Sequence, residues 1–531
     1  MSSKTMTERA DRPTGNWQAR REMAPSLVRP EEPTVARWVG SLGLVLVAVG
    51  AGILLWANFS SSGGNPLSGL VALGAGILCL LFHASVDRDV QIRRSYGVLG
   101  LLWLLAAILA ASIPFKDLPL QARFLTYSVP SLILALMFLL PFARHEAESE
   151  WRAWISLGLG GVGAALALTS LIGSNVSADF LLPYGLVLGV LGLAWWWASV
   201  GVLGISDDRA YWSGVGMGVF GAVMFIIALA RSIIPPLSYA LGWMAERPTD
   251  SYLATAGLPL LFLGTLYMAI SAGLVSDNVL VTLTRRELAA FFYSPIAYIV
   301  LFSFTIVGAV QYGIFFDQVY ESSTPFSRTQ PLVEPIIQSY IFSLLPVFCM
   351  LLIVPVVTMR LLSEEKRTGT LEVLLTAPVD DNTVVLSKFF ASLIFYLALW
   401  VPWGLFLIGL RVGIGQPFDY RPLISFFIAL VASGSGFLSM GLFFSALTRN
   451  QIAAAILSAM GMVVMLAVYL LKYIFTPDSL WWNLFKYVSF VDFWATTLLG
   501  RLVVYEVVFY LSLAVFWLFL TVKVLEARKW K

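Results

Sequence analysis

A short, densely charged stretch holds the residues of this chain that are best suited to recognising another molecule. Glu364, Glu365, Lys366 and Arg367 follow one another, and Thr368-Gly369-Thr370 comes directly after them. Carboxylate, ammonium and guanidinium groups form ion pairs and charge-assisted hydrogen bonds. Each such charge costs about 2.5–3.5 kcal/mol at the centre of a bilayer. We therefore expect this stretch to lie in water and to present its side chains to a binding partner.

Local signals predict the shape of the stretch. Glycine costs about 1 kcal/mol within a helix, so Thr368-Gly369-Thr370 should end a first helical turn. A second short helix can follow, with Glu372 near its positive end. Its apolar residues fall at helical spacing and form one stripe, made by Leu371, Leu374 and Leu375. Because Pro378 ends this helix, the sequence predicts an amphipathic hairpin over residues 360–388; an ordinary solvated loop is the alternative.

Catalytic and metal-binding patterns do not occur in the sequence. A phosphate-binding P-loop ends in Gly-Lys followed by Ser or Thr, and none of the nine lysines follows a glycine. The two histidines, His83 and His145, have no partners at catalytic or metal-ligand spacing. Cys79 and Cys349 lie in apolar runs and are expected to be packing residues. We expect a chain that is not an enzyme and binds no cofactor or metal, and its net charge of +3 gives no reason to expect nucleic acid.

Composition places the chain in a membrane. Charged residues make up 12% of its 531 residues, against roughly 25% in soluble domains. Apolar runs of about twenty residues recur, and each is long enough to cross a hydrocarbon core of about 30 Å. We predict an all-α polytopic membrane protein with about fourteen transmembrane helices. These lie near residues 38–57, 66–84, 96–113, 124–143, 153–173, 181–203, 211–230, 253–275, 296–316, 340–359, 389–410, 422–447, 451–471 and 502–522.

The distribution of basic residues predicts the orientation. If the N-terminus lies in the cytoplasm, the inner segments carry 24 of the 34 lysines and arginines. Positively charged loops favour the cytoplasmic side, so both termini are expected inside. The polar segment 1–36 has no apolar face to bury and is expected to be a disordered cytoplasmic tail.

Two further motifs flank the charged stretch, and together the three resemble a known family. Arg285-Arg286-Glu287 leads into Phe291 and Ser294-Pro295, and Thr448-Arg449-Asn450-Gln451 forms a tight turn between two spans. In their order and spacing the motifs resemble ABC-2-type permeases of ABC transporters, in the gliding-motility-type branch. The resemblance covers about residues 280–531, which contain six predicted spans, the usual core of such a permease.

The resemblance implies roles for these residues. Residues 360–388 would be the coupling hairpin that docks on an ATP-binding subunit, through Arg360, Glu364, Glu365, Lys366, Arg367, Thr368, Gly369, Thr370, Glu372, Leu374, Leu375 and Pro378. An interfacial elbow helix would contain Arg285, Arg286, Glu287, Phe291, Ser294 and Pro295, and the inner turn would be Thr448, Arg449, Asn450 and Gln451. Residues 474–500 would form a re-entrant segment in the outer leaflet.

The implied partners are a dimer of a separate ATP-binding subunit, which would hold ATP and Mg, and a second permease copy or a related permease. An extracytoplasmic auxiliary subunit accompanies many members of this branch. The implied activity is ATP-driven export of an unidentified substrate across the cytoplasmic (inner) membrane of a bacterium.

The first eight spans depart from the six-span core. We place a domain boundary near residue 276, which gives an eight-span membrane domain of unknown role over 37–275 and a permease domain over 276–531. Gly185-xxx-Gly189 and Gly214-xxx-Gly218 in the first domain allow close helix packing. Two other functions stay open: a fourteen-span secondary transporter or lipid flippase, and a non-transporting membrane scaffold. Glu506 is the chief acidic residue within a span, whereas ion-coupled transporters usually hold such groups near the midplane.

Overall fold

Helices form the described part of this chain. The computed structural model describes residues 34–59, 66–86, 90–113, 120–144, 149–177, 180–204, 207–243, 257–322, 336–370, 379–414, 421–477 and 479–527, and no strand occurs among them. The chain forms two compact units, residues 1–159 and 160–531. The predicted all-α, polytopic class is confirmed.

Ten helices in the described residues are long and apolar enough to cross a membrane. Pro259–Val275 and Val279–Tyr293 form a pair bent by 97°, and they make an eleventh span if counted as one. Three shorter apolar helices stand at the other predicted positions, at Trp38–Gly50, Ala72–Ala84 and Val129–Arg144. The chain is therefore an integral membrane protein, and each of the fourteen predicted spans falls on an apolar helix.

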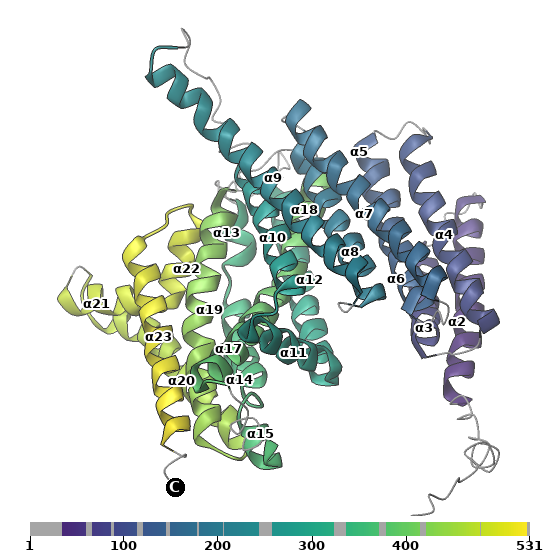
Figure 1. The fold of residues 1–531 in the computed structure, drawn as a ribbon. Helices are drawn as coiled ribbons and strands as arrows, with labels where there is room; N and C mark the ends of the chain where they lie inside the picture. The colour runs from purple at the N-terminus through teal and green to yellow at the C-terminus, as the bar shows by residue number, and fades with distance from the viewer. Residues whose placement is uncertain are drawn as a thin grey trace, which may run out of the picture. The chain divides into compact units, whose positions relative to one another are not determined.

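The first unit is built from helices that pair along the sequence. Its elements are α2 (Thr34–Phe59), α3 (Pro66–Val86), α4 (Val90–Ser112), α5 (Leu120–Arg123), the π-helix η1 (Phe124–Ser128), α6 (Val129–Arg144) and the start of α7 (Ser149–Val176). Helix α2 packs on α3, and α4 packs on α6 (Figure 1). Nδ1 of His83 on α3 lies 2.8 Å from the hydroxyl of Tyr96 on α4, in a buried contact between the two helices.

The second unit begins with a glycine-packed group of helices. It contains the rest of α7, the π-helix η3 (Leu181–Gly185), α8 (Leu186–Leu203), α9 (Asp208–Ala240) and α10 (Leu258–Val275). Helices α9 and α10 approach closely at Gly221 and Gly264, where a Cβ atom on either residue would lie 2.8 Å from the carbonyl oxygen of the other. A methyl group at Gly218 would lie 2.4 Å from the Ser271 hydroxyl, so the predicted small-residue face is used for close packing.

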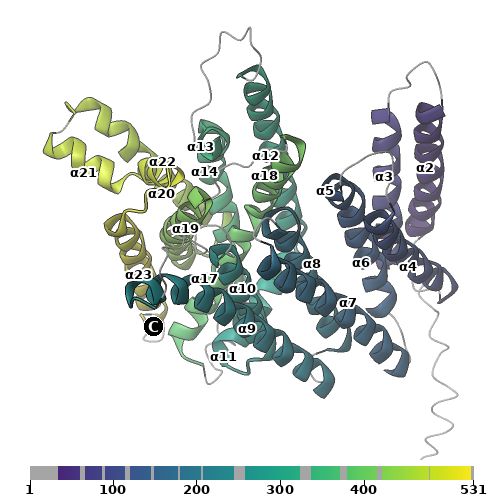
Figure 2. The ribbon, with the colours of Figure 1, turned by 90° about the horizontal axis from the view of Figure 1, so that it is seen from above.

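The remaining helices of this unit contain the three motifs identified in the sequence. They are α11 (Val279–Tyr293), α12 (Pro295–Ser322), α13 (Ile336–Ile341), α14 (Leu344–Thr358), α15 (Ser363–Thr368), α17 (Asp381–Leu399), α18 (Val401–Ile414), α19 (Arg421–Leu447), α20 (Gln451–Leu471), the 3-10 turn η5 (Lys472–Ile474), α21 (Leu480–Val488), α22 (Phe490–Leu498) and α23 (Val504–Glu526). Helix α19 has α23, α20, α17 and α22 packed around it (Figures 1 and 2). Large aromatic side chains fill the core, among them Trp403, Trp494 and Tyr396.

Two predicted spans are broken helices. The span predicted at 340–359 begins as α13 and restarts as α14, whose third residue is Pro346. The span predicted at 389–410 is interrupted at Trp400, two residues before Pro402. Proline has no N–H group and cannot bond to the carbonyl four residues earlier, which explains both breaks.

The two compact units do not divide at residue 276, because α7 to α10 and α11 to α23 lie in the same unit. Separate hydrophobic clusters nonetheless occur within it. One contains Leu171, Met217, Leu263 and Tyr267 of the earlier helices, and two others are made by the later helices. The domain boundary near 276 stays a prediction.

Candidate functional site

The charged stretch forms a short, sharply ended helix. After α14 ends at Thr358, a turn leads into α15 (Ser363–Thr368), and Gly369 follows with φ of 76°. Only glycine adopts this left-handed conformation without steric cost. The Thr368 hydroxyl donates to the Glu364 carbonyl oxygen at 3.0 Å and lies 2.9 Å from the Thr370 hydroxyl. The Thr-Gly-Thr stretch therefore ends the helix, as the sequence predicted.

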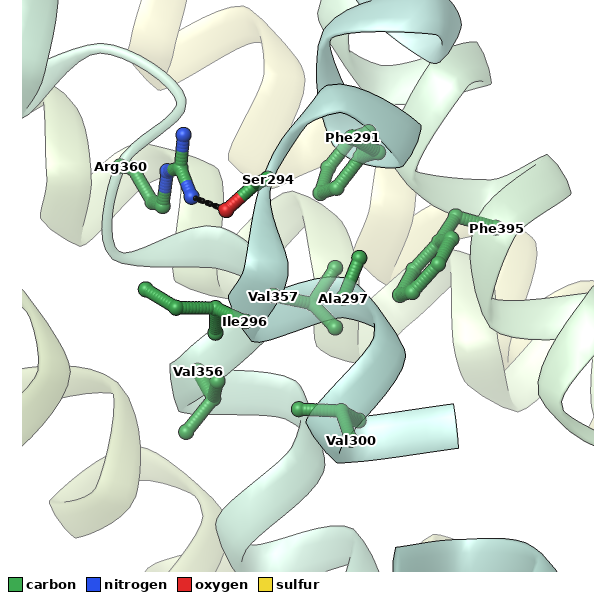
Figure 3. Close-up of a pocket in the computed structure, with 9 residues that line it drawn as sticks. All are labelled: Phe291, Ser294, Ile296, Ala297, Val300, Val356, Val357, Arg360 and Phe395. Atoms are coloured by element: carbon green, nitrogen blue, oxygen red, sulfur yellow. Dashed lines mark hydrogen bonds between the residues drawn. The ribbon is translucent and has the colours of Figure 1, made fainter. Parts of the chain in front are cut away.

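Arg360 joins this turn to the end of α11. Its Nε donates to Oε2 of Glu364 at 3.2 Å, and its NH1 donates to the Ser294 hydroxyl. Figure 3 shows Arg360 pointing at the adjacent Ser294, and both residues line a small apolar hollow together with Val357 and Phe291. Ser294 is buried and caps the C-terminus of α11, immediately before Pro295 begins α12. The guanidinium group thus fixes the corner between the elbow helix and the next span.

A buried lysine connects three helices. Lys388 on α17 is only 2% exposed, and its Nζ lies 2.9 Å from Oε2 of Glu287 on α11 and 2.6 Å from Oε1 of Glu365 on α15. Arg286 adds an exposed contact of 2.9 Å to the other oxygen of Glu287. Removing one partner of a buried ion pair leaves an uncompensated charge and costs about 3–5 kcal/mol. The elbow helix, the charged helix and α17 are therefore held together by one charge.

Two further contacts attach α15 to α19. The Ser445 hydroxyl accepts hydrogen bonds from the backbone N–H groups of Leu362 and Ser363, both at 3.1 Å, and donates to the Met359 carbonyl oxygen at 3.2 Å. Lys366 is buried and its Nζ donates to the carbonyl oxygen of Ala446. These bonds satisfy backbone groups at the N-terminus of α15 and near the C-terminus of α19, which a helix cannot pair internally.

The expectation that the whole stretch faces water was wrong. Lys366 is buried and Glu365 has 20% of its side chain exposed, whereas Glu364 retains 38% and Arg367 is exposed. Adjacent residues on a helix point about 100° apart, so four consecutive charges cannot all face the same side. Glu365 and Lys366 form bonds to other helices, whereas Glu364 is partly exposed and Arg367 is exposed. Only part of the stretch is therefore available to a partner.

Other residues of the predicted hairpin lie beyond the described part of the chain. These are Glu372, Leu374 and Leu375, with Pro378, so the second half of the hairpin stays a prediction. The structure resumes at residue 379, and α17 begins at Asp381, close to the predicted restart.

The elbow residues lie along α11, which is bent by 97° from α10. NH1 of Arg285 donates to the carbonyl oxygen of Leu274 at 3.0 Å and so stabilises this bend. Phe291 stacks on Phe395 of α17, with ring centroids 4.9 Å apart and planes at 6°. The predicted amphipathic helix therefore exists and packs through its aromatic residues on α17.

The predicted inner turn joins α19 to α20. Asn450 caps α20, because its side-chain oxygen accepts from the Ile452 N–H at 2.9 Å, and the Thr448 hydroxyl donates to the Asn450 carbonyl oxygen at 3.1 Å. Arg449 is exposed and Gln451 begins the helix. The turn starts one residue after Leu447, so it lies directly beside the contacts that hold α15.

The predicted re-entrant segment contains two short helices, α21 and α22. Lys472, two residues before this segment, pairs with its Asp492 at 2.5 Å. Helix α22 is largely buried: its Trp494 donates to the Ser433 hydroxyl at 3.0 Å, and the Ser425 hydroxyl donates to the Thr497 carbonyl oxygen at 2.6 Å. Both serines belong to α19, so α19 carries α15 near its C-terminus and α22 nearer its N-terminus.

Three residues of the site were not among the predicted site residues: Lys388, Ser445 and Ala446. Lys388 had one sequence signal, since it is a single charge in an otherwise apolar helical segment, and such a residue needs a buried partner. Ser445 and the backbone of Ala446 had none, because a serine in an apolar helix most often bonds to its own backbone.

Comparison with known proteins finds a similarity to one family over the part of the chain that contains most of the site. The model of a family described as ABC-2 family transporter protein matches residues 316–525. No curated protein and no solved structure matches the chain. The matched residues include α15 and its anchors on α17 and α19, and they leave out the elbow helix. Over residues 316–525, this integral membrane protein is similar to ABC-2 family transporter proteins.

Proposed function

We propose that this chain is the membrane-spanning permease subunit of an ABC-2-type exporter of the gliding-motility-type branch. ATP and Mg would be bound by a separate ATP-binding subunit, present as a dimer, and a second permease copy or a related permease would complete the transport path. Both termini would lie in the cytoplasm at a bacterial inner membrane, and an extracytoplasmic auxiliary subunit is a further possible partner. The family match over residues 316–525 supports the transporter class.

One observation carries the docking role of α15. This six-residue helix is anchored on α17 through Glu365, on α19 through Lys366 and on the elbow corner through Arg360. Glu364 pairs with Arg360 and keeps 38% of its side chain exposed, and Arg367 is exposed. A rigid element with exposed charge can bind a partner, and a movement of the bound partner would be transmitted to the three membrane helices that anchor it. A solvated loop would need none of these anchors.

The test uses the exposed charge that takes part in none of these anchors. Arg367→Glu reverses this charge and keeps the bonds of Glu364, Glu365 and Lys366. The purified chain is scored for a co-purifying P-loop ATPase and, in liposomes, for ATP turnover. Lys523→Glu is the matched control, because it also reverses one exposed basic side chain, near the end of α23, and touches no anchor.

We expect the intact chain and the control to retain the ATPase and the α15 variant to lose most of it. Equal retention by both variants would move the docking site elsewhere. If the intact chain retains no ATPase, the ABC permease proposal fails.

An ion-coupled transporter is the second candidate, and one observation favours it. Glu506 at the start of α23 is 5% exposed, and its Oε2 is buried without a hydrogen-bond partner in the described residues. A buried carboxyl in a membrane helix is often a transport site. Uptake or export that follows a proton or cation gradient without ATP, and that is abolished by Glu506→Gln, would support this reading over the ABC exporter.

A further inference from the structure

A cavity of about 250 Å³ lies beside the ion pairs of the site. It opens between α11, the turn before α15 and α17. The residues that matter for its chemistry are Glu287, Ala290, Arg360, Glu364, Glu365 and Lys388. Pockets for drug-sized ligands start at about 300 Å³. This one therefore suits a single long side chain rather than a transported molecule.

The walls of the cavity carry more negative than positive charge. Three carboxylates face two cations, and one of these cations, Lys388, is shared between Glu287 and Glu365. Arg286 touches Glu287 from outside, but its side chain is 56% exposed, so water screens that pair strongly. An added cation would therefore be bound favourably.

One carboxylate that lines the cavity has an oxygen without a donor among the described residues. Oε1 of Glu365 accepts from Lys388, whereas its Oε2 is buried and meets no donor in the described part of the chain. A buried acceptor without a donor costs about 1–3 kcal/mol. Water could supply a donor here but not the missing positive charge.

We propose that this cavity receives a basic side chain, arginine or lysine, from the ATP-binding subunit. The inference rests on the proposed function, because it assigns that subunit a specific contact. The neighbouring stretch 371–378 contains no lysine or arginine, so the nearest unplaced residues of the chain cannot supply the group. In the complex, the basic side chain would pair with the Glu365 carboxylate and lie between the elbow helix and α15. The subunit would then hold both elements together.

Filling the cavity is the sharpest test. Ala290 lines it, whereas its neighbour Ala289, which is also exposed on the same helix, does not. Ala290→Phe should weaken binding of the co-purifying P-loop ATPase about tenfold or more, and the matched variant Ala289→Phe should not change it. The affinity is measured by titrating the purified ATPase onto the full-length chain in lipid nanodiscs.

A second variant removes the charge without changing the size. Glu365→Gln can still accept from Lys388, and it should also weaken ATPase binding about tenfold. A photo-reactive benzophenone amino acid at position 290 identifies the occupant: a cross-link to an ATPase segment that contains lysine or arginine is expected.

The outcomes separate this proposal from the proposed function. If the intact chain binds no P-loop ATPase, the permease function fails and this inference fails with it. If the ATPase binds the intact chain, Ala290→Phe and Glu365→Gln with equal affinity, only the cavity proposal is overturned. A cross-link to the chain's own residues 1–33 or to lipid would overturn it as well.

Discussion

Nζ of Lys388 and Oε1 of Glu365 lie 2.6 Å apart, although 23 residues separate them in the sequence. The lysine belongs to a long membrane helix and the glutamate to the six-residue helix α15. Because Lys388 is almost fully buried, the pair fixes the position of α15 as well as its charge. The contact makes the short charged helix a part of the membrane bundle.

Replacing Lys388 with methionine should destabilise the protein strongly. The substitution keeps most of the side-chain volume and leaves Glu287 and Glu365 without their shared cation. The expected loss is about 3–5 kcal/mol, measured as a lower unfolding temperature in detergent. Lys523→Met is the control, since its pair with Glu526 is exposed and should contribute less than about 1 kcal/mol. Similar unfolding temperatures for the two variants would contradict the structural role of Lys388.

Replacing Ser294 with alanine should loosen the corner between α11 and α12. The variant removes the acceptor for the Arg360 guanidinium, and a hydrogen bond to a charged group contributes about 1.5–3 kcal/mol. We expect reduced stability together with weaker coupling of ATP turnover to transport. Ser512→Ala removes an exposed hydroxyl that bonds only within α23 and should leave both measurements unchanged. If Ser294→Ala behaves like that control, the corner is held by other contacts.

Gly369 should tolerate asparagine better than alanine. Its φ of 76° is left-handed, a conformation that costs L-residues about 1–2 kcal/mol, with asparagine the least affected. Within the described residues, no atom lies within 4 Å of a Cβ added there, so size is not the obstacle. ATPase binding should fall in the order glycine, asparagine, alanine. The helical Gly313, which also has open space around it, provides the control substitution to alanine, and no loss is expected there.

Gly221→Val should disrupt the packing of α9 on α10. A Cβ atom at this position would lie 2.6 Å from the Tyr267 side chain and 2.8 Å from the Gly264 carbonyl oxygen. Overpacking of this kind costs about 1–3 kcal/mol or more, which thermal unfolding would register. Gly273→Val on α10, where nothing lies near the added Cβ, separates the loss of glycine from the clash. Equal effects at the two positions would mean that close packing is not what Gly221 provides.

The sequence predicted the helices well and their side-chain contacts poorly. Apolar runs located α9, α19 and α23 because lipid-crossing helices need a length that composition reveals. The glycine after α15 predicted its end because few residues accept that backbone conformation. The prediction that Glu365 and Lys366 face water was wrong. Their orientation depends on Lys388 and on the carbonyl oxygen of Ala446, which belong to helices far away in the sequence. Sequence spacing carries no information on such long-range pairs without a known fold.

The span of α19 has a mechanical consequence. At 27 residues it is about 40 Å long, given a rise of 1.5 Å per residue. Near one end Ser445 and Ala446 hold α15, and toward the other Ser425 and Ser433 hold α22. A hydrogen-bonded helix transmits axial force with little compression, and no loop interrupts this one. If α15 is displaced along the α19 axis by a few ångströms, α19 should therefore move as a rigid body and displace α22 by nearly the same distance.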